Sequence, residues 1–423
     1  MPSFWLRFLR DGVLCLLLCF PAEETISAAQ VRWKHLSSAT GDLPLPGTST
    51  EQTGVVVADF DGDRTNDFVI SFRQVAPALV WYRPLHGSWT RTVIEPEFLT
   101  VEAGGAVHDI DGDGDLDLAF GGDWQSNEVW WWENPGKAWD ERTPWKRRAI
   151  KKGGAKQHHD QVFADLLGTG RPQFAFWNQG ARRIFLAEIP DDARNAGPWP
   201  TVEIFSGETK PAGSSVSPPS TQPLTRSSEL SRYPEGMSAC DIDGDGKLDL
   251  LAGNTWFKHT SGKSFLPTRI GAVGGLIFAG RFKAGKYPQV VIAPGDGTGP
   301  LRLYECAGDP RNSNDWRGRD LLPRDVVHGH SLQLGDIDRD GHLDIFAAEM
   351  AKWSKPDRPD DNPSATAWIL FGDGTGKFRT ETLSTGIGFH EARLADLNGD
   401  GRLDILNKPY TWKAPRIDIW VQQ

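Results

Sequence analysis

The chain has 423 residues, with 46 Gly, 29 Pro and a formal net charge of −10. This acidic balance does not favour a nucleic-acid partner, because a polyanion is bound by clustered basic residues. Frequent glycine and proline without a long amphipathic helical pattern indicate short strands joined by turns.

Residues 1–29 have the pattern of a secretory signal peptide. Arg7 and Arg10 precede an apolar run at 12–20, and small residues follow it up to Ala29. A membrane anchor is the alternative, but this run is about half of the ~20 residues that a spanning helix needs. We therefore expect a secreted or periplasmic protein without a membrane span.

The remaining residues, 30–423, are expected to form one large repeat domain, because no linker or charge run divides them. Once the signal peptide is removed, Cys240 and Cys306 are the only cysteines left. They could form one disulfide at most, and the sequence leaves open whether they are paired. Burial and bound metal must therefore hold the fold together.

A nine-residue aspartate-rich motif recurs five times, at 59–67, 109–117, 241–249, 336–344 and 396–404. Side-chain oxygens at motif positions 1, 3, 5 and 9 and a backbone carbonyl at position 7 suit a hard cation that takes roughly six to eight oxygen ligands. We expect about five structural calcium ions. The side-chain ligands would be Asp59, Asp61, Asp63, Asp67, Asp109, Asp111, Asp113, Asp117, Asp241, Asp243, Asp245, Asp249, Asp336, Asp338, Asp340, Asp344, Asp396, Asn398, Asp400 and Asp404.

An EF-hand is the first alternative for this motif. Its loop needs a bidentate glutamate at position 12 and a helix on each side. Here position 12 is occupied by Ile70, Phe120, Ala252, Ala347 and Asn407. The flanking segments have strand patterns, so each loop should join two strands. The chain thus resembles the FG-GAP/VCBS repeat family, whose blades also form the integrin α-subunit propeller, and this resemblance implies a β-propeller.

Two further segments, 165–173 and 279–289, lie at the corresponding place in the repeat but lack the set of acidic ligands. They are interpreted as metal-free blades, which brings the fold to an all-β, seven-bladed propeller with four-stranded blades. After the last loop only two strands remain, Leu403 to Asn407 and Arg416 to Val421. The segment from Val31 to Leu36 is expected to complete the last blade, so that no ring edge stays open.

The first strand of each blade should begin near the axis, on the face opposite the calcium loops. Counting six and five residues back from each loop gives small residues in blades 1, 2 and 5. The other blades bring His159, Asp160, Glu235, His330, His390 and Glu391. We expect His159, Glu235, His330 and His390 to hold a single transition metal, and Asp160 and Glu391 to be catalytic. The alternative is a set of solvated polar residues at a channel mouth.

The second-strand ends add further candidates on the same face. Lys408 and Tyr410 could act as general base or proton donor. The tryptophans Trp124, Trp177, Trp256, Trp353 and Trp412 could stack on sugar rings or pack between blades. Two insertions, 207–232 and 352–364, could be lids or surface loops.

The enzyme hypothesis is a metal-assisted carbohydrate lyase or dehydratase. Segments 388–393 and 407–412, with His158-His159-Asp160, resemble pieces of the propellers of aldos-2-ulose dehydratases, which implies β-elimination from a sugar. The alternative is a non-catalytic glycan- or protein-binding module of the integrin kind, and a third is a scaffold without ligand. We expect a monomer whose partner is a carbohydrate or small sugar, with a protein partner as the other option.

Overall fold

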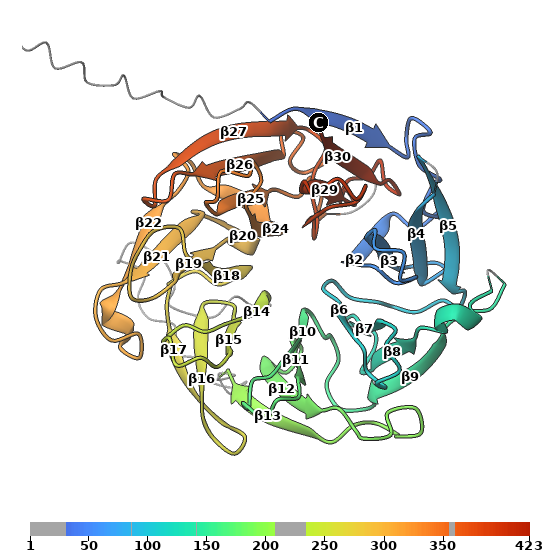
Figure 1. The fold of residues 1–423 in the computed structure, drawn as a ribbon, viewed down its shortest axis with the longest axis horizontal. Coiled ribbons are helices and arrows are strands. Elements are labelled where there is room, and N and C mark those ends of the chain that lie inside the picture. Colours follow the sequence, from blue (N-terminus) through green and yellow to red (C-terminus); the bar gives the residue numbers. More distant parts are fainter. Residues whose placement is uncertain (1–30, 86, 141, 208–233, 355–359) are drawn as a thin grey trace, which may run out of the picture.

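The computed structural model describes residues 31–85, 87–140, 142–207, 234–354 and 360–423. Its strands form seven four-stranded antiparallel sheets that are arranged radially around one axis (Figure 1). Helix within these ranges is limited to two short 3-10 turns, Gly136–Ala138 and Ser313–Asp315. The predicted all-β, seven-bladed propeller is therefore confirmed.

Blades 1 to 4 and blade 6 use consecutive strands, blade 5 skips β20, and the first strand of each blade lies nearest the axis (Figure 1). Blade 1 contains β2 (Glu51–Ala58), β3 (Asp67–Arg73), β4 (Leu79–Leu85) and β5 (Ser88–Glu95). Blade 2 contains β6 (Ala106–His108), β7 (Asp117–Gly121), β8 (Val129–Glu133) and β9 (Lys146–Lys151). Blade 3 contains β10 (Gln161–Ala164), β11 (Gln173–Asn178), β12 (Arg183–Glu188) and β13 (Thr201–Ser206). Blade 4 contains β14 (Met237–Cys240), β15 (Asp249–Ala252), β16 (Thr255–Ser261) and β17 (Ser264–Arg269). Blade 5 contains β18 (Ile277–Gly280), β19 (Gln289–Ile292), β21 (Arg302–Cys306) and β22 (Trp316–Asp320). Blade 6 contains β24 (Ser331–Gly335), β25 (Asp344–Ala348), β26 (Thr366–Gly372) and β27 (Phe378–Thr385).

The last blade closes the ring with a strand from the beginning of the chain. It contains β28 (Arg393–Ala395), β29 (Asp404–Asn407), β30 (Asp418–Gln422) and β1 (Trp33–Ser37). β1 pairs antiparallel with β30, with Leu36 opposite Ile419. The predicted closure is confirmed, and it leaves no unpaired blade edge at the junction.

Blade 5 departs from the repeat. After β19 the chain forms β20 (Gly295–Gly299), which pairs with β23 (Val326–Gly329) in a separate two-stranded ribbon. The sequence did not predict this ribbon. It carries Asp296 and His328 to the end of the ring at which the first strands begin.

Blades pack on one another through buried aromatic side chains. Between blades 1 and 2, Trp81 and Trp132 lie in one apolar cluster. Trp177 and Trp256 are fully buried in the clusters of blades 3 and 4. These two tryptophans therefore pack within the core and cannot stack on a ligand.

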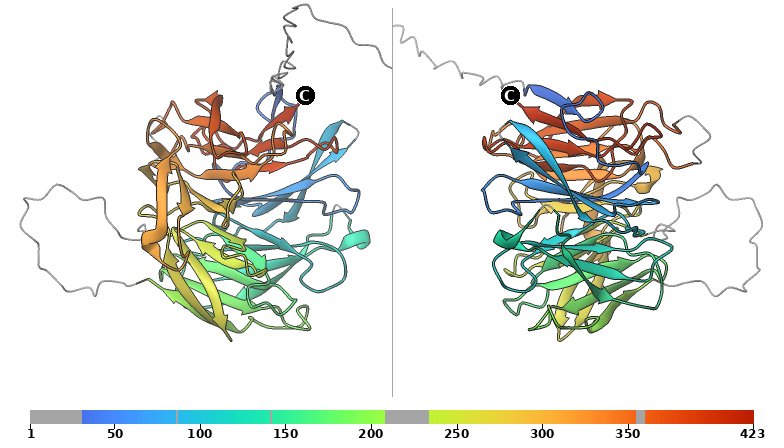
Figure 2. Two further views of the ribbon diagram at one scale, coloured as in Figure 1. Left: turned by 60° about the vertical axis from the view of Figure 1, so that its left-hand side comes forward. Right: turned by 90° about the vertical axis from the view of Figure 1, so that its right-hand side faces the viewer.

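The ring is a disc whose two faces are separated by the length of the strands (Figure 2). The aspartate loops join the first and second strands at one face, and the first strands begin at the other. Cys240 and Cys306 are not bonded to each other. Within the described ranges, no helix is long and apolar enough to cross a membrane.

Candidate functional site

The five aspartate loops share one local geometry. In each, the carboxylate at position 9 accepts a hydrogen bond from the backbone N–H at position 2, as Asp67 does from Phe60 at 3.2 Å and Asp344 does from Ile337 at 2.7 Å. The same bond holds Asp117, Asp249 and Asp404. This bond turns the position-9 carboxylate towards the other acidic side chains of its loop.

The donor sets fit a hard divalent cation. In the loops of blades 1, 2, 4 and 6, carboxylate oxygens from positions 1, 3 and 9 lie within 4.8 Å of one another. In blade 6, Oδ1 of Asp336 and Oδ1 of Asp338 are buried and accept no hydrogen bond from any described residue. Burial and the neighbouring Asp61 carboxylate raise the pKa of Asp67 to about 8. Clustered, poorly solvated carboxylates of this kind are stabilised by a bound calcium ion.

The loops of blades 3 and 5 keep a hydrogen bond from a backbone N–H to the position-9 side chain, from position 3 in blade 3 and from position 2 in blade 5, but that side chain is uncharged. In blade 5, Oε1 of Gln289 accepts a hydrogen bond from Phe282 N at 2.9 Å. In blade 3, Oε1 of Gln173 accepts one from Leu167 N at 2.9 Å. A neutral amide thus replaces the position-9 carboxylate, which agrees with the interpretation of these blades as metal-free.

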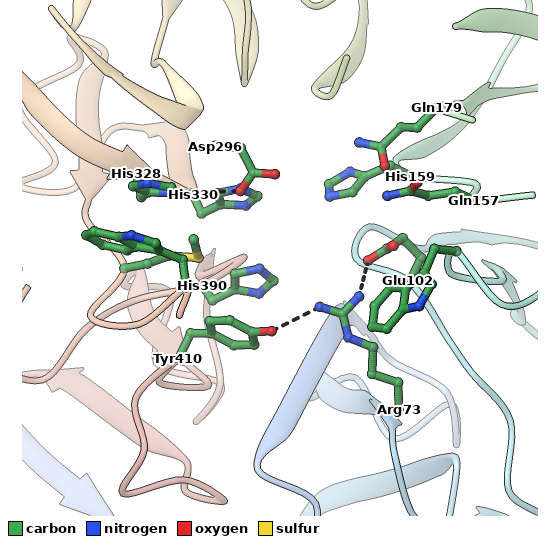
Figure 3. Close-up of a pocket in the computed structure, with 13 residues that line it drawn as sticks. Arg73, Glu102, Gln157, His159, Gln179, Asp296, His328, His330, His390 and Tyr410 are labelled. Atoms are coloured by element: carbon green, nitrogen blue, oxygen red, sulfur yellow. Dashed lines mark hydrogen bonds and ion pairs between the residues drawn. The ribbon is translucent and has the colours of Figure 1, made fainter. Parts of the chain in front are cut away.

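The opposite end of the ring holds a cavity of about 470 Å³ that we call the axial pocket (Figure 3). It collects side chains from strand starts, strand ends and the β20–β23 ribbon. Its lining consists of Arg73, Glu102, Trp124, Gln157, His159, Gln179, Asp296, His328, His330, Met350, Trp353, His390 and Tyr410. The three histidines predicted for this face therefore share one pocket.

Three of the four predicted axial metal ligands form a compact cluster on one wall of this pocket. Single ligand atoms of His159, Glu235 and His330 lie within 4.8 Å of one another, and all three residues are buried. Nε2 of His330 lies 3.1 Å from Oε2 of Glu235 and 2.9 Å from Oδ1 of Asp296. One imidazole nitrogen carries at most one proton, so it cannot satisfy both carboxylates. A divalent cation would satisfy both, and the imidazole and carboxylate donors suit manganese, iron or zinc.

The charges in this cluster are strongly coupled. Burial opposes a charged imidazole, but the Asp160 carboxylate raises the pKa of His159 to about 10. Burial likewise disfavours the charged form of His330, yet the carboxylates of Glu235 and Asp296 raise its pKa well above the usual value. Without a cation, the cluster is therefore held together by protons that a metal would displace.

Glu235 is held by the backbone of the ribbon. Its Oε1 accepts a hydrogen bond from Asp296 N. A side chain at Gly295 would collide with this carboxylate, because a Cβ there would lie 1.6 Å from Oε1, and Gly295 has a φ of +58°. Glycine at this position lets the ribbon approach Glu235 and deliver Asp296.

Asp160 orients His159 and does not face the pocket. Its Oδ2 lies 2.6 Å from Nδ1 of His159 and accepts a hydrogen bond from Gly236 N at 2.6 Å. This leaves Nε2 of His159 directed towards Glu235, at 3.9 Å. Asp160 was expected to be catalytic, and its carboxylate is engaged behind His159, where it positions the imidazole.

His390, the fourth predicted ligand, lies beside the cluster and outside it. Its ring stacks on His330 with centroids 4.8 Å apart and on Tyr410 at 4.6 Å. Nδ1 of His390 lies 2.6 Å from Nζ of Lys408. Burial lowers the pKa of His390 well below its ordinary value, so the ring is neutral at physiological pH.

Lys408 is fully buried and does not line the pocket. Besides His390, its Nζ contacts the carbonyl oxygens of Thr53 at 2.5 Å and Gln52 at 3.2 Å. Burial lowers its pKa well below the usual value. Lys408 was expected to act on the substrate, and the structure instead places it behind His390.

Glu391 was expected to be catalytic as well. Its Oε2 lies 2.7 Å from Nη2 of Arg393, and the residue does not line the pocket. Tyr410 does line it. The Tyr410 hydroxyl donates to Oε2 of Glu51 and accepts from Nη2 of Arg73 at 2.9 Å (Figure 3).

Two tryptophans remain exposed at the pocket. Trp124 is 53% and Trp353 is 42% exposed. The Arg73 guanidinium lies 4.7 Å from the Trp124 ring centroid, and the His328 ring stacks on Trp353 at 3.9 Å. The ring of Trp412 is instead covered by Lys352, whose Nζ lies 4.0 Å from the ring centroid. Trp124 and Trp353 are thus available to a ligand.

Part of each predicted insertion lies outside the described residues, namely 208–232 of the first and 355–359 of the second. At the start of the second, Oδ2 of Asp361 accepts hydrogen bonds from Trp353 N at 2.7 Å and from Ser354 N at 2.8 Å. These bonds hold Trp353 at the pocket.

Sequence reasoning missed Arg73, Glu102, Asp296 and His328. Arg73 is the last residue of β3 and could have been found by extending the list of second-strand ends. Asp296 and His328 come from the ribbon, which has no counterpart in the other blades, and no periodic signal marks them.

Comparison with known proteins agrees with this architecture. The FG-GAP repeat family matches residues 233–266, which contain the aspartate loop of blade 4. Cartilage acidic protein 1 from Mus musculus is 28% identical over 220 residues, which is 43% of this chain and 31% of that protein. The chain thus spans less than a third of that relative's length.

Two solved structures share the fold at low identity. BBS1N in complex with ARL6DN has a TM-score of 0.53 at 9% identity and covers 92% of this chain and 97% of its own. Virginiamycin B lyase from Staphylococcus aureus has a TM-score of 0.51 at 12% identity and covers 92% of this chain and 99% of its own. The chain is a seven-bladed β-propeller that contains an FG-GAP repeat in its fourth blade.

Proposed function

We propose that this protein is an exported, calcium-stabilised propeller whose axial pocket carries out a metal-assisted elimination on a small neutral sugar. The observation that carries the proposal is the cluster of His159, Glu235 and His330, where Nε2 of His330 faces two carboxylates. A divalent transition metal bound there would polarise a substrate carbonyl and so acidify the adjacent C–H group.

His390 is the proton acceptor in this proposal. It lines the pocket, its ring is neutral, and it stacks directly on the ligand His330. A neutral Lys408 has two N–H groups for the carbonyls of Gln52 and Thr53 and a lone pair for Nδ1–H of His390. This arrangement leaves Nε2 of His390 unprotonated, and a proton taken there can be shared through Nδ1 with Lys408.

Tyr410 is the proton donor. Burial raises the pKa of its hydroxyl well above the usual value, so the group keeps its proton at neutral pH. The hydroxyl lies in a chain from Arg73 to Glu51. In the elimination, His390 takes the proton next to the carbonyl, and the β-hydroxyl leaves as water with a proton from Tyr410. One C–H bond and one C–O bond break, and one C=C bond forms.

The charges around the pocket favour a neutral sugar over an acidic one. Each of the three guanidinium nitrogens of Arg73 is already bonded, to Glu51, Glu102 and Tyr410. No described lysine lines the pocket. Within the described ranges, Oε1 of Gln179 is buried without a partner, and the Asp296 carboxylate is partly exposed. These groups accept hydrogen bonds from hydroxyls, while Arg73, the one arginine in the described lining, already pairs with two carboxylates of the protein.

The exposed rings of Trp124 and Trp353 supply the apolar part of sugar recognition, because the C–H faces of a sugar ring stack on indole. The same two residues support the second candidate function, which is glycan binding without turnover. In either case, the signal-peptide pattern of residues 1–29 supports export, and the calcium-rich environment outside a cell would fill the aspartate loops.

The test compares binding with turnover in one protein. Wild-type protein loaded with calcium and with manganese, iron or zinc in turn is mixed with neutral keto-sugars and with uronides. Loss of water by mass spectrometry and new ultraviolet absorbance from a conjugated double bond are measured, and binding is measured by calorimetry. We expect turnover of a neutral keto-sugar that His390→Gln and Tyr410→Phe abolish while binding persists. His259→Gln, at a half-buried position of β16 that does not line the pocket, is the matched control.

Binding without turnover for every metal would favour the glycan-binding candidate. Turnover of uronides alone would contradict the neutral substrate class. A wild-type protein that neither binds nor converts any sugar would overturn the proposal.

A further inference from the structure

The aspartate loop of blade 4 differs from the others because the ammonium group of a lysine from another strand, Lys258 of β16, lies among its carboxylates. Nζ of Lys258 is 2.7 Å from Oδ2 of Asp245, 2.9 Å from Oδ1 of Asp243 and 3.4 Å from Oδ1 of Asp249. These carboxylates are motif positions 5, 3 and 9, the ones that would ligate calcium. An ammonium group has three N–H donors, so it can serve all three at once.

The lysine reaches the loop from a defined place in the blade. It follows Phe257 of β16, which pairs with Leu250, the residue after Asp249. The equivalent residues of the other acidic blades are Arg83, Glu133, Phe371 and Val421. Only blade 4 has a lysine at this position.

The other basic residues near the loops fit less closely. Nη1 of Arg83 lies 3.6 Å from Oδ2 of Asp61, farther than any of the three distances from Nζ of Lys258. Arg194 contacts Asp111 and Asp113 of the blade 2 loop, but it also pairs with Glu133, and its side chain is 41% exposed. An exposed side chain can move into water at small cost. The Lys258 side chain is only 15% exposed.

We propose that Lys258 is a built-in cation of the blade 4 loop, which calcium must displace, so that this loop binds calcium more weakly than the loops of blades 1, 2 and 6, which have the same four aspartates, and its blade folds without calcium. The Lys258 ammonium group binds the same carboxylates that a calcium ion needs as ligands. The ammonium group and the calcium ion therefore cannot bind these carboxylates at the same time. This inference rests on the calcium part of the proposed function, since it concerns how the loops differ in affinity. It does not depend on the axial pocket.

The experiment counts bound calcium in full-length protein by equilibrium dialysis against radioactive calcium. Wild type is expected to bind four ions, and a fifth, that of blade 4, at least about tenfold more weakly than the loops with the same four aspartates, since site affinity follows the net charge of the ligand set. Lys258→Met is expected to bring the fifth ion to the affinity of the others. Lys247→Met is the matched control, because it removes the same charge from position 7 of the same loop, and it should leave the count at four.

Thermal melting gives a second measurement that does not depend on the count. With a chelator, Lys258→Met should melt below wild type, because four carboxylates then lack any cation, and excess calcium should remove this difference. Five equally tight ions in wild type would overturn the inference, and so would a Lys258→Met protein that matches Lys247→Met in both measurements. Failure of every loop to bind calcium would instead contradict the proposed calcium role.

Discussion

The two faces of the ring are built on opposite principles. On the loop face one nine-residue motif is used five times, and each copy carries its own ligands and its own hydrogen bond from position 2 to position 9. On the axial face the residue at the same offset from the loop varies between blades, with histidine in blades 3, 6 and 7, glutamate in blade 4 and small residues in blades 1, 2 and 5. His159, Glu235 and His330 come from blades 3, 4 and 6 and meet only because the ring closes.

This difference separates stability from chemistry. A loop can lose its metal ligands and keep its shape, as Gln173 and Gln289 show. A residue of the axial pocket cannot be replaced by another blade, because there is no second copy of it. We therefore expect changes on the loop face to alter stability and changes on the axial face to alter binding and turnover.

Removing calcium should have the largest effect. Each ion at a concentration one hundred times its dissociation constant stabilises the native state by about 2.7 kcal/mol, so loss of several ions removes most of the stability of an ordinary domain. Addition of a chelator should lower the melting temperature by more than about 10 °C, measured by calorimetry. An unchanged melting temperature would contradict the calcium role of the loops.

The pH dependence of the calcium-free protein should reveal the same carboxylates. Burial raises the pKa of Asp67 and of Asp117 to about 8, against an ordinary value of 3.8. Because the folded-state pKa is raised, the stabilisation is fully present below the ordinary value and is lost as pH rises through about 8. Chelated protein should therefore resist urea better at pH 5 than at pH 9.

In calcium the dependence should reverse, because protons compete with the ion for these carboxylates. Urea denaturation with and without calcium at several pH values checks both signs. A calcium-free protein that becomes more stable as pH rises from 5 to 9 would show that these carboxylates do not control stability.

The Asp160→Asn variant sharpens the contrast from the axial side. It keeps the size of the side chain but removes the charge that orients His159, so axial metal affinity should fall about 10- to 100-fold. The calcium count and the melting temperature in calcium should stay close to wild type. Asp165→Asn, in the metal-free loop of blade 3, is the control and should change neither quantity.

The smallest effect is expected at the pocket rim. Trp124→Ala should weaken sugar binding by about 1 kcal/mol through lost stacking, without changing the bound metals. Calorimetric titration with the best sugar ligand measures it. Phe98→Ala is the control, since Phe98 is exposed but does not line the pocket. Equal binding by both variants would remove Trp124 from the sugar site.

The position and local geometry of the aspartate loops could be predicted from the sequence, since each motif lies within nine consecutive residues. Ring closure by β1 followed from counting strands after the last loop. The axial face could be predicted only in part. Strand register placed His159, Glu235, His330 and His390 at one end of the ring, and they do share a pocket or its wall.

Register alone could not assign roles to these residues. Strand register shows at which face of the ring a residue lies, but it does not show what the side chain of that residue contacts. Asp160, Lys408 and Glu391 lie at the predicted end of their strands and are engaged by His159, His390 and Arg393. Asp296 and His328 could not be found, because their ribbon interrupts the repeat.

The most direct test of the account is the metal content of calcium-saturated protein, measured by elemental analysis for wild type and for His330→Ala. We expect about one equivalent of a transition metal in wild type, its loss in His330→Ala, and the same calcium content in both. Wild-type protein that holds no transition metal when one is supplied, or a His330→Ala protein that holds as much as wild type, would contradict the axial metal site.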